Sequence, residues 1–357
     1  MINSNSAVLK SLGNWDYDQI KIKDPLEGEV LVKVIQCGIC STDIIRSMEV
    51  GFYHYPIVPG HEIIGKVYKL GKNSSPKFKE GDKVCVYPLI TKCTSNYCCG
   101  HSNTVYGFGK APNLCSDYDF LGSRSHGGYS EYILAPEKNL VKIPNDLEDD
   151  LSVFTEPSAV ALHAIKIAKK DRSFDSVIIS GLGPIGILIA QWCKYFKIKN
   201  VIGVDRNKNR FKNFFDVGYN DIIDTSTDNI KDKIEQFTKQ DLAEVCFECS
   251  GSEELLQNSI SNLKKGGKII ILSNQVNDIK ISKEVLNKIL RQEISLSGSW
   301  SSIIDPVNEW EESLSFLKNN QNIKKLISHK FNFNKANTLF PSLYNKEFKF
   351  SKVILEP

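Results

Sequence analysis

Three short stretches in the first half of the chain carry residue types that bind metal ions and activate hydroxyl groups. Cys40 stands before Ser41-Thr42-Asp43, His61 stands before Glu62 in P-G-H-E-I-I-G, and Glu156 stands in F-T-E-P. A thiolate, an imidazole and a carboxylate suit a tetrahedral catalytic zinc that keeps its fourth position open for water or substrate. Such a zinc acts as a Lewis acid and lowers the pKa of a bound hydroxyl, so that the alkoxide can release hydride. We therefore predict a zinc site at Cys40, His61 and Glu156, with Thr42 passing the alcohol proton outward.

Glu62 has two open roles at this site. Adjacent residues of an extended chain point to opposite faces, so its carboxylate is expected to point away from the His61 ring. It is then either a supporting group behind the ligands or an alternate ligand. Each of these residues also has an ordinary structural interpretation when taken alone, and their joint occurrence ahead of a nucleotide-binding pattern favours the zinc site.

A second stretch, Ser176 to Asp205, is typical of a dinucleotide site. A short β-branched run leads into G-x-G-x-x-G at Gly181, Gly183 and Gly186, and an apolar helical run and a second strand follow. Gly181 allows the sharp turn, Gly183 lets the backbone approach a pyrophosphate, and Gly186 lets the helix lie close to the sheet. The helix N-terminus then presents free N–H groups to the phosphates.

Asp205 ends the second strand, where it can accept hydrogen bonds from an adenosine ribose and repel a 2′-phosphate. This acid favours NAD over NADP. The basic residues just after it, Arg206, Lys208 and Arg210, are the counter-argument, because they can seat a 2′-phosphate. The residues assigned to the cofactor are Gly181, Gly183, Pro184, Ile185, Gly186, Asp205, Arg210, Ser273, Ser299 and Trp300.

The elements around these residues indicate two domains in 357 residues. The first 155 residues contain short strand-like runs between Gly, Pro and Asn turns, which is typical of an irregular β-barrel. From about Pro157 to Ile294 strands and helices alternate, which predicts a doubly wound parallel sheet of about six strands. The tail is too short for a domain and is expected to fold back onto the first one. We predict a catalytic domain at 1–156 and 296–357, interrupted by a Rossmann domain at 157–295.

Composition excludes several classes of partner. The 45 basic and 42 acidic residues give a net charge of +3 without long like-charged blocks, so neither nucleic acid nor a membrane surface is an expected partner. The first residues contain no apolar core like that of a signal peptide, and no run is long enough to span a bilayer. We therefore expect a cytoplasmic protein, whose ten cysteines are thiols or metal ligands.

The sequence resembles the zinc-containing medium-chain alcohol and polyol dehydrogenases over essentially its full length. The matching landmarks are Cys40-Ser41-Thr42-Asp43, Gly60-His61-Glu62 with Gly65, Gly81-Asp82-Lys83-Val84, Gly127 to Tyr132, Glu156-Pro157 and the Gly181 turn. The resemblance implies a GroES-like barrel with an inserted Rossmann domain. It also implies that Cys40, His61 and Glu156 hold the catalytic zinc, that Thr42 belongs to a proton relay, and that the chain forms a homodimer or homotetramer.

Within this family the chain is most similar to the galactitol-1-phosphate 5-dehydrogenases, in Tyr118 to Arg124, Leu162-His163-Ala164, Gly298-Ser299-Trp300 and Glu309-Trp310. That branch oxidises a phosphorylated hexitol to tagatose 6-phosphate with NAD. Arg124 is the candidate for the substrate phosphate, because a guanidinium gives a bidentate, permanently charged contact. An ion pair between Arg124 and a loop aspartate is the alternative. Dehydrogenases of unphosphorylated polyols and of threonine share most of the motifs, and a non-catalytic NAD sensor or scaffold is the alternative of another class.

The family also carries a structural zinc held by four cysteines, and this sequence departs from that pattern. It has Cys93, Cys98, Cys99 and Cys115, with Asn96 where the second cysteine is expected. Vicinal cysteines rarely bind one metal together, so His101 is a further candidate ligand. We predict a possible structural zinc at the four cysteines, the alternative being unligated thiols in a remodelled loop.

Overall fold

The computed structural model describes residues 1–92, 111–275 and 277–357 of the chain. These residues form two compact units. The first unit contains the described residues up to Glu156 together with Ile303–Pro357, and the second contains Pro157–Ser302.

A mainly antiparallel sheet forms the centre of the first unit, in the order β16-β17-β3-β4-β5-β9, with β8 beside β3. Only the β16–β17 pair is parallel within it. Its strands are β3 (Glu29–Gly38), β4 (Glu62–Leu70), β5 (Lys83–Val86), β8 (Tyr132–Pro136), β9 (Leu140–Lys142), β16 (Ile327–Asn332) and β17 (Lys352–Glu356). Because β16 and β17 come from the C-terminal tail, the tail completes the sheet begun by the N-terminal strands, as predicted from its length.

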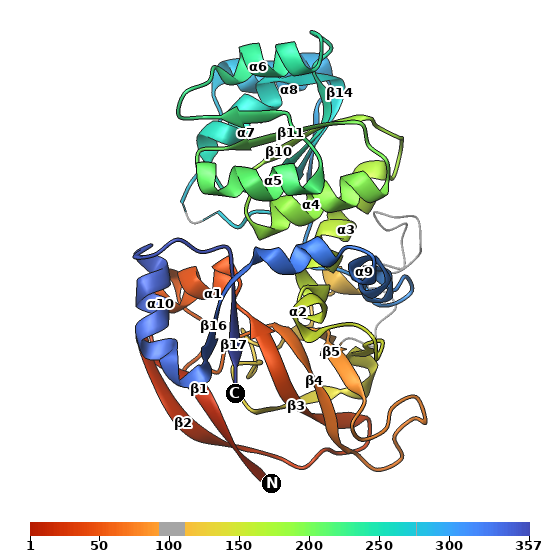
Figure 1. Ribbon diagram of the computed structural model, residues 1–357, viewed down its shortest axis with the longest axis vertical. Helices are drawn as coiled ribbons and strands as arrows, with labels where there is room; N and C mark the ends of the chain where they lie inside the picture. The colour runs from red at the N-terminus through yellow and green to blue at the C-terminus, as the bar shows by residue number, and fades with distance from the viewer. Residues whose placement is uncertain (93–110, 276) are drawn as a thin grey trace. The chain divides into compact units, whose positions relative to one another are not determined.

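Two smaller two-stranded sheets and several short helices also belong to the first unit (Figure 1). These antiparallel sheets pair β1 (Ile2–Ser11) with β2 (Asn14–Ile22), and β6 (Leu89–Thr91) with β7 (Tyr118–Phe120). The helices are α1 (Ser41–Ile45), the π-helical η1 (Arg46–Val50), η2 (Pro112–Leu114), η3 (Glu137–Asn139), α2 (Asp149–Ser152), α9 (Glu309–Lys318), η5 (Gln321–Leu326), η6 (Phe333–Lys335) and α10 (Ala336–Tyr344). Helix α3 (Thr155–Lys169) begins at the end of the first unit's main segment.

Three neighbouring strands of this sheet end or begin at the same place. Gly38, the last residue of β3, is opposite Glu62 of β4 on one side and Ile354 of β17 on the other. The chain leaves β3 toward Cys40, enters β4 from His61, and enters β17 at Lys352. The register therefore brings together residues that are far apart in the sequence.

The second unit is a six-stranded parallel sheet in the order β12-β11-β10-β13-β14-β15. Its strands are β10 (Ser176–Ser180), β11 (Asn200–Asp205), β12 (Ile222–Asp224), β13 (Ala243–Glu248), β14 (Leu263–Ile271) and β15 (Ser295–Gly298). Its helices after α3 are α4 (Pro184–Tyr195), η4 (Lys208–Arg210), α5 (Phe211–Val217), α6 (Ile230–Phe237), α7 (Glu253–Ser261) and α8 (Lys283–Gln292). The order reverses between β10 and β13, which is the point where such sheets bind nucleotides.

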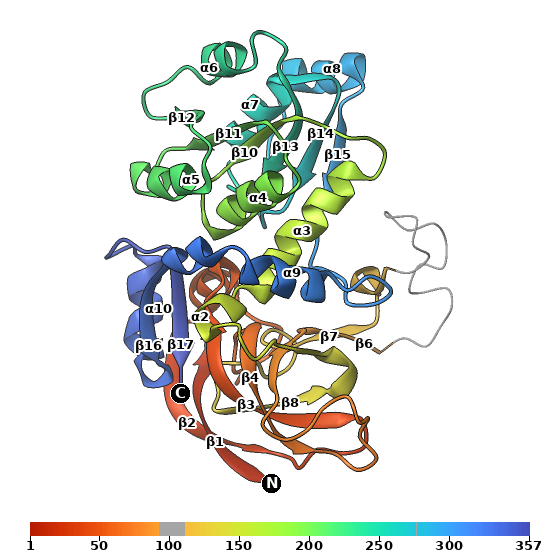
Figure 2. The same cartoon turned by 45° about the vertical axis from the view of Figure 1, so that its right-hand side comes forward.

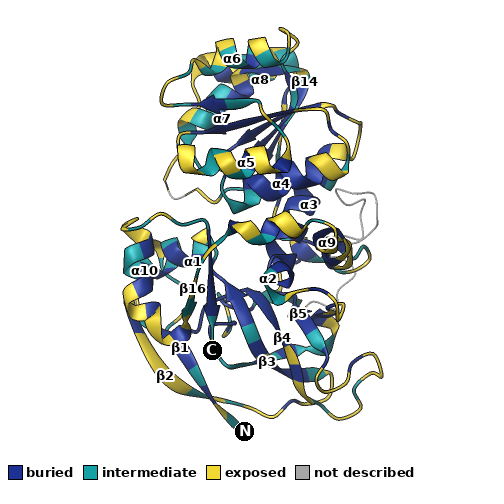
Figure 3. Cartoon of the chain, viewed as in Figure 1, coloured by how far each residue is buried: buried dark blue, intermediate teal, exposed yellow. Residues whose placement is uncertain are grey.

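Helices cover both faces of this sheet (Figures 1 and 2). Helices α4 and α5 lie on one face, and α6, α7 and α8 lie on the other. Because both faces are covered, the central strands are buried throughout their length, as in all five residues of β10, while outer helices such as α6 expose one side (Figure 3). The predicted doubly wound parallel sheet, inserted in a mainly β-stranded unit, is what the described residues form.

The predicted end of the nucleotide domain at residue 295 is wrong. Strand β15 lies beyond that boundary and pairs in parallel with β14, with Gly298 opposite Ile271. Its hydrogen bonds place it in the second unit, which extends to Ser302.

Candidate active site

Cys40 lies where β3 gives way to helix α1, and the local hydrogen bonds fix its position. The side chain of Asp43 accepts a hydrogen bond from the Cys40 backbone N–H at 3.2 Å. The Thr42 hydroxyl donates to Cys40 Sγ at 3.1 Å. Since that hydroxyl donates its own hydrogen to sulfur, the lone pairs of its oxygen are left to accept a hydrogen bond from another hydroxyl.

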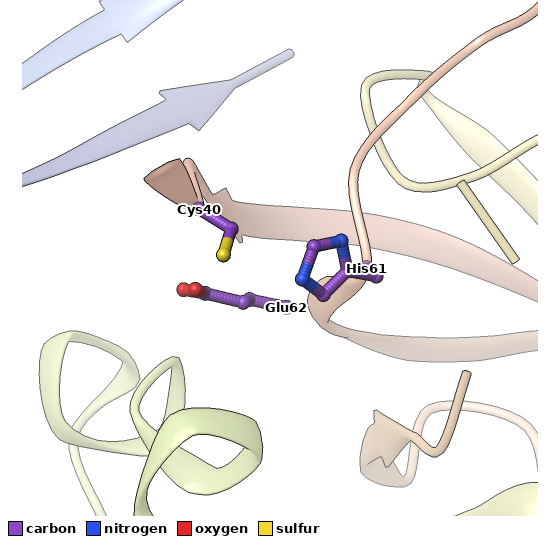
Figure 4. A group of neighbouring side chains, drawn as sticks. All are labelled: Cys40, His61 and Glu62. Carbon is purple, nitrogen blue, oxygen red and sulfur yellow. The ribbon is translucent and has the colours of Figure 1, made fainter. Parts of the chain in front are cut away.

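His61 is held by a buried carboxylate. Its Nδ1 lies 3.3 Å from Asp43 Oδ1, and the Tyr129 hydroxyl donates to Asp43 Oδ2 at 2.7 Å. Burial acts to lower the pKa of His61, but Asp43 outweighs it and raises that pKa well above its ordinary value. A carboxylate on one ring nitrogen fixes the orientation of the imidazole and leaves the other nitrogen for a metal. That nitrogen faces Cys40 and Glu62 (Figure 4).

Glu62 turns toward the same point as His61, so the expectation that these neighbours point apart is wrong. His61 precedes β4 instead of lying in it, so strand alternation does not govern the pair. The Glu62 carboxylate lies across Gly38, where an added Cβ would come within 2.0 Å of Oε2. A larger residue at Gly38 would displace this carboxylate.

Cys40, His61 and Glu62 form the group of potential metal donors in the described residues. One donor atom from each lies within 4.8 Å of the others (Figure 4). Zinc binds sulfur, nitrogen and oxygen at about 2.0–2.3 Å, so tetrahedral ligand atoms are separated by roughly 3–4 Å. The donor set and its spacing therefore fit zinc with small side-chain movements.

Glu156, the predicted third ligand, is buried at the start of α3. Burial, with Glu62 and Asp43, raises the pKa of its carboxyl to about 7, although His61 and Lys352 act in the opposite direction. The charge state of Glu156 is thus linked to the Cys40–His61–Glu62 group, and a bound cation would favour its ionised form.

Sequence reasoning missed three residues that support this group: Asp43, Tyr129 and Lys352. Asp43 and Tyr129 lie inside motifs noted in the sequence, but no role was predicted for them. Tyr129 contacts Asp43, which in turn contacts His61, and no residue spacing in the sequence predicts these contacts. Lys352 pairs with Glu62 across 290 positions. The closeness of Lys352 to Glu62 becomes evident only from the pairing of β17 with β3.

The glycine turn of the second unit has the geometry that a pyrophosphate needs. Gly181 has φ +96°, and Gly183 caps α4. A Cβ on Gly186 would lie 2.0 Å from Gly181 O, whereas a Cβ on Gly183 would meet no atom within 4 Å. Gly186 is therefore required by packing, and Gly183 leaves open space in front of the helix N-terminus. Pro184 and Ile185 form the first turn of that helix.

Asp205 lies at the end of β11, and its buried carboxylate accepts hydrogen bonds from three groups of the protein. It accepts from the Leu182 and Asn207 N–H groups at 2.8 Å each, and from Arg210 Nη1 at 3.1 Å. Lys208 pairs with Asp224 at 3.1 Å. Two of the basic residues that could seat a 2′-phosphate therefore already pair with carboxylates.

The other predicted cofactor residues lie at the carboxyl ends of β14 and β15. The Ser273 hydroxyl donates to Glu248, and the Ser299 N–H donates to Ile271 O at 2.8 Å. The hydroxyl of Ser299 is buried and has no hydrogen-bond partner among the described residues, which suits a ligand-facing group. Trp300 is partly exposed. Glu248, missed from the sequence, also accepts from Ser250 and Gly251 and so fixes the loop after β13.

Arg124 lies in the turn after β7, between two tyrosine rings. Its Cζ is 4.3 Å from the Tyr53 ring centroid and 4.5 Å from that of Tyr118. No carboxylate of the described residues forms an ion pair with it, and Asp119, in the strand before this turn, pairs with Lys92 at 3.4 Å. Among the described residues, Arg124 therefore does not pair with an aspartate, which was the alternative role predicted for it.

The structure tests only one member of the predicted structural zinc site. Cys93, Cys98, Cys99 and His101 lie outside the described residues. Cys115 is buried, and its Sγ lies 3.2 Å from Asp117 O.

Within the residues that the structure describes, no helix has the length and apolar character required to cross a bilayer.

Comparisons with known proteins agree with this geometry. Residues 26–145 match the alcohol dehydrogenase GroES-like domain, and residues 184–319 match the zinc-binding dehydrogenase family. A sorbitol dehydrogenase of Halalkalibacterium halodurans is 31% identical over 343 residues, covering 93% of each chain. Galactitol 1-phosphate 5-dehydrogenase of Escherichia coli is 27% identical over 310 residues, covering 86% of each chain.

Solved structures agree over the whole chain. Galactitol-1-phosphate dehydrogenase from Escherichia coli superimposes with a TM-score of 0.87 at 25% identity, covering 99% of this chain and 100% of the other. An alcohol dehydrogenase from Escherichia coli complexed with NADH gives 0.86 at 25% identity, covering 99% of each chain. The chain belongs to the zinc-type medium-chain alcohol and polyol dehydrogenases. It is an oxidoreductase of that family, and the predicted enzyme class and the zinc and nicotinamide cofactors are confirmed at family level.

Proposed function

We propose that this enzyme uses NAD to oxidise a secondary hydroxyl of a polyol phosphate, with galactitol 1-phosphate as substrate and tagatose 6-phosphate as product. The reaction would remove a hydride from the carbinol carbon, which NAD would accept, and a proton from its hydroxyl, so the products would be a ketone, NADH and a proton. The observation that carries the proposal is the convergence of Cys40, His61 and Glu62 beside Thr42, with Arg124 in a neighbouring turn.

Cys40, His61 and Glu156 would hold the zinc, which supplies Lewis-acid polarisation of the hydroxyl. Glu62 already has both oxygens within 2.7 Å of Lys352 Nζ, so its charge is compensated without a metal. Glu156 has no such close lysine among the described contacts, and burial disfavours its charge. This difference favours Glu156 as the third ligand and Glu62 as a supporting carboxylate.

Thr42 would accept a hydrogen bond from the substrate hydroxyl, because its own hydrogen is directed to Cys40 Sγ. For the substrate proton to leave through Thr42, that hydrogen would turn away from Cys40 Sγ and pass to solvent as the substrate proton arrives. Asp43 would keep the His61 ring in place through the cycle. Neither role requires the chain to move during the reaction.

NAD is the proposed cofactor because Asp205 holds the ribose position. Its pairing with Arg210 leaves that guanidinium engaged before any 2′-phosphate arrives. The proposed adenosine contact is a pair of ribose hydroxyls donating to Asp205.

The test is NAD reduction by the zinc-loaded enzyme with polyols supplied in pairs, starting with galactitol 1-phosphate and galactitol. We expect a kcat/KM for the phosphorylated member higher by roughly a hundredfold, since contacts of a phosphate with arginine are charge-assisted. Faster turnover of sorbitol or xylitol, or of L-threonine, would replace the proposed substrate with that one. Zinc binding without turnover of any of them would favour a non-catalytic NAD sensor.

We also propose that the enzyme assembles as a homodimer or homotetramer through β15. This strand has one described neighbour in the sheet and so presents an open edge. Sedimentation of the wild type and of a variant with Pro in place of Leu296 tests this, with a monomeric variant as the expected result.

A further inference from the structure

Two arginines of the first unit stack on the same tyrosine ring. Arg124 Cζ lies 4.3 Å from the centroid of Tyr53, and Arg46 Cζ lies 4.8 Å from it. Each guanidinium contacts a second ring, Tyr118 at 4.5 Å for Arg124 and Phe52 at 4.7 Å for Arg46. Such cation–π contacts hold the guanidinium planes in place without neutralising their charge.

The charges of this pair are not compensated in the described part of the chain. Arg46 Nε donates to Gly51 O at 3.1 Å, and Arg124 Nη2 lies 3.4 Å from the Tyr118 hydroxyl. Both of those acceptors are neutral. The two acids nearest to Arg46 in the sequence have other partners. Asp43 contacts His61 and Tyr129, and Glu49 accepts a hydrogen bond from the Tyr344 hydroxyl at 2.9 Å. Each guanidinium has five N–H donors, so the pair retains donors for an anion.

The hydroxyl of Tyr53 responds to both arginines. Burial acts to raise its pKa, but the nearby Arg124 and Arg46 lower it overall. The Tyr53 side chain is more than half exposed, so the ring on which both guanidinium groups stack is open to solvent.

Both arginines belong to segments that also position the candidate zinc ligands. Arg46 directly follows helix α1, which Cys40 caps. Arg124 lies in the turn that follows Phe120, whose ring is edge-on to His61 at 5.7 Å. The same turn packs on the residue before His61, since a Cβ on Gly122 would come within 2.4 Å of Gly60 O. The arginine pair is thereby tied to both Cys40 and His61.

We propose that Arg46 and Arg124 form a clamp around Tyr53 that binds the phosphate monoester of the substrate. The inference rests on the proposed function and adds Arg46 and Tyr53 to the single arginine expected from the sequence. Two guanidinium groups match the two charges and three oxygens of a phosphate monoester, whereas a carboxylate brings one charge and two oxygens. The clamp therefore distinguishes a polyol phosphate from a sugar acid or an amino acid.

The direct test is calorimetric titration of the zinc-loaded enzyme, saturated with NADH, with inorganic phosphate. We expect one phosphate site, weakened roughly tenfold or more by Arg46→Gln and by Arg124→Gln. Arg124→Lys keeps the positive charge but loses the paired N–H donors of the guanidinium. Its affinity for phosphate should therefore fall less than that of Arg124→Gln. The matched control is Arg172→Gln, because Arg172 donates to Gly266 O in the second unit. Phosphate affinity equal to wild type in both Gln variants, or no phosphate binding by the wild type, would overturn the clamp.

A kinetic arm separates this inference from the proposed function. In both Gln variants kcat/KM for galactitol 1-phosphate should fall by a factor at least roughly tenfold larger than the fall in kcat/KM for galactitol. Equal losses for the two substrates would overturn the clamp and leave the dehydrogenase in place. Phosphate binding that depends on both arginines, in an enzyme that oxidises no polyol, would support the clamp and remove galactitol 1-phosphate as substrate.

Discussion

Lys352 Nζ donates to both carboxylate oxygens of Glu62, at 2.7 and 2.6 Å, and both side chains are buried. Burial acts to lower the pKa of Lys352, but the Glu62 carboxylate outweighs it and raises that pKa above its ordinary value. The pair joins the first residue of β17 to the first residue of β4 on either side of the end of β3. The C-terminal tail thus supplies the charge that lets a carboxylate stand beside Cys40 and His61.

Removing the lysine should therefore destabilise the chain strongly. In metal-free protein we expect Lys352→Met to lower the free energy of unfolding by about 3–5 kcal/mol, because it leaves the Glu62 charge buried and unpaired. Urea denaturation of the wild type and of Lys352→Met measures this loss in the free energy of unfolding. Adding Glu62→Gln to that variant should recover much of the loss, since no charge remains to be compensated.

The control for this prediction is Lys330→Met. Lys330 pairs with Asp150 at 2.5 Å and with Glu356 at 3.3 Å, but these side chains are about one third exposed. That loss should be no more than about 1 kcal/mol. Similar losses in Lys330→Met and Lys352→Met would contradict the special role of the buried pair.

Glu156 predicts a pH dependence of the metal-free protein. Its pKa in the folded state is raised to about 7 from an ordinary 4.5, so the folded state holds this proton more tightly than the unfolded state does. The contribution of Glu156 to stability is then greatest below about pH 4.5 and falls as the pH rises toward 7, by an amount on the order of 3 kcal/mol. Urea unfolding of chelator-treated wild type and Glu156→Gln across this range measures it. The variant should lack this decline, and parallel curves for the two proteins would refute the assignment.

The zinc ligands make a separate prediction. Cys40→Ala and His61→Ala should lose zinc, measured by elemental analysis, and kcat should fall by roughly a thousandfold or more. NADH affinity should stay near the wild-type value, since the predicted dinucleotide residues belong to the second unit. Cys85→Ser is the control, because that buried thiol contacts Ser152 O instead of the donor group. Full activity in either Ala variant would exclude zinc catalysis at this position.

The fold was predictable because its signals are local. The G-x-G-x-x-G turn, the alternation after Pro157 and the short strands before it each extend over a few residues. The boundary at 295 was placed before the last strand that the sequence predicts, which ends near Trp300, and that strand pairs with β14.

The site was predictable only for residues that belong to motifs. Cys40, Thr42, His61 and Glu62 were found in this way, but the convergence of His61 and Glu62 depends on where β4 begins. Lys352 and Arg46 carry no motif, and their partners are set by strand pairing and by the packing of two loops. Such contacts arise from tertiary structure, which residue spacing does not encode.

Gly183 and Gly186 should respond differently to alanine. Gly186→Ala places a Cβ against Gly181 O, so it should destabilise the second unit, whereas Gly183→Ala has open space and should fold normally. We expect Gly183→Ala to weaken NADH binding by tenfold or more, roughly, because the methyl group occupies the approach of the pyrophosphate. Fluorescence titration and thermal unfolding of both variants test this. Wild-type NADH affinity in Gly183→Ala would refute the proposed phosphate position.

The contact between Asp205 and Arg210 predicts the cofactor preference. Asp205→Asn keeps an acceptor for the Leu182 N–H but removes the charge that engages Arg210 at 3.1 Å. Arg210 would then be released toward a 2′-phosphate, so the ratio of kcat/KM for NAD over NADP should fall by roughly ten- to a hundredfold. Adding Arg210→Gln should remove the gain with NADP but not restore NAD. Asp224→Asn, which frees Lys208 instead, is the matched control. If it shifted the ratio as far as Asp205→Asn does, general loss of negative charge would explain the effect, and Asp205 would not be the ribose acceptor.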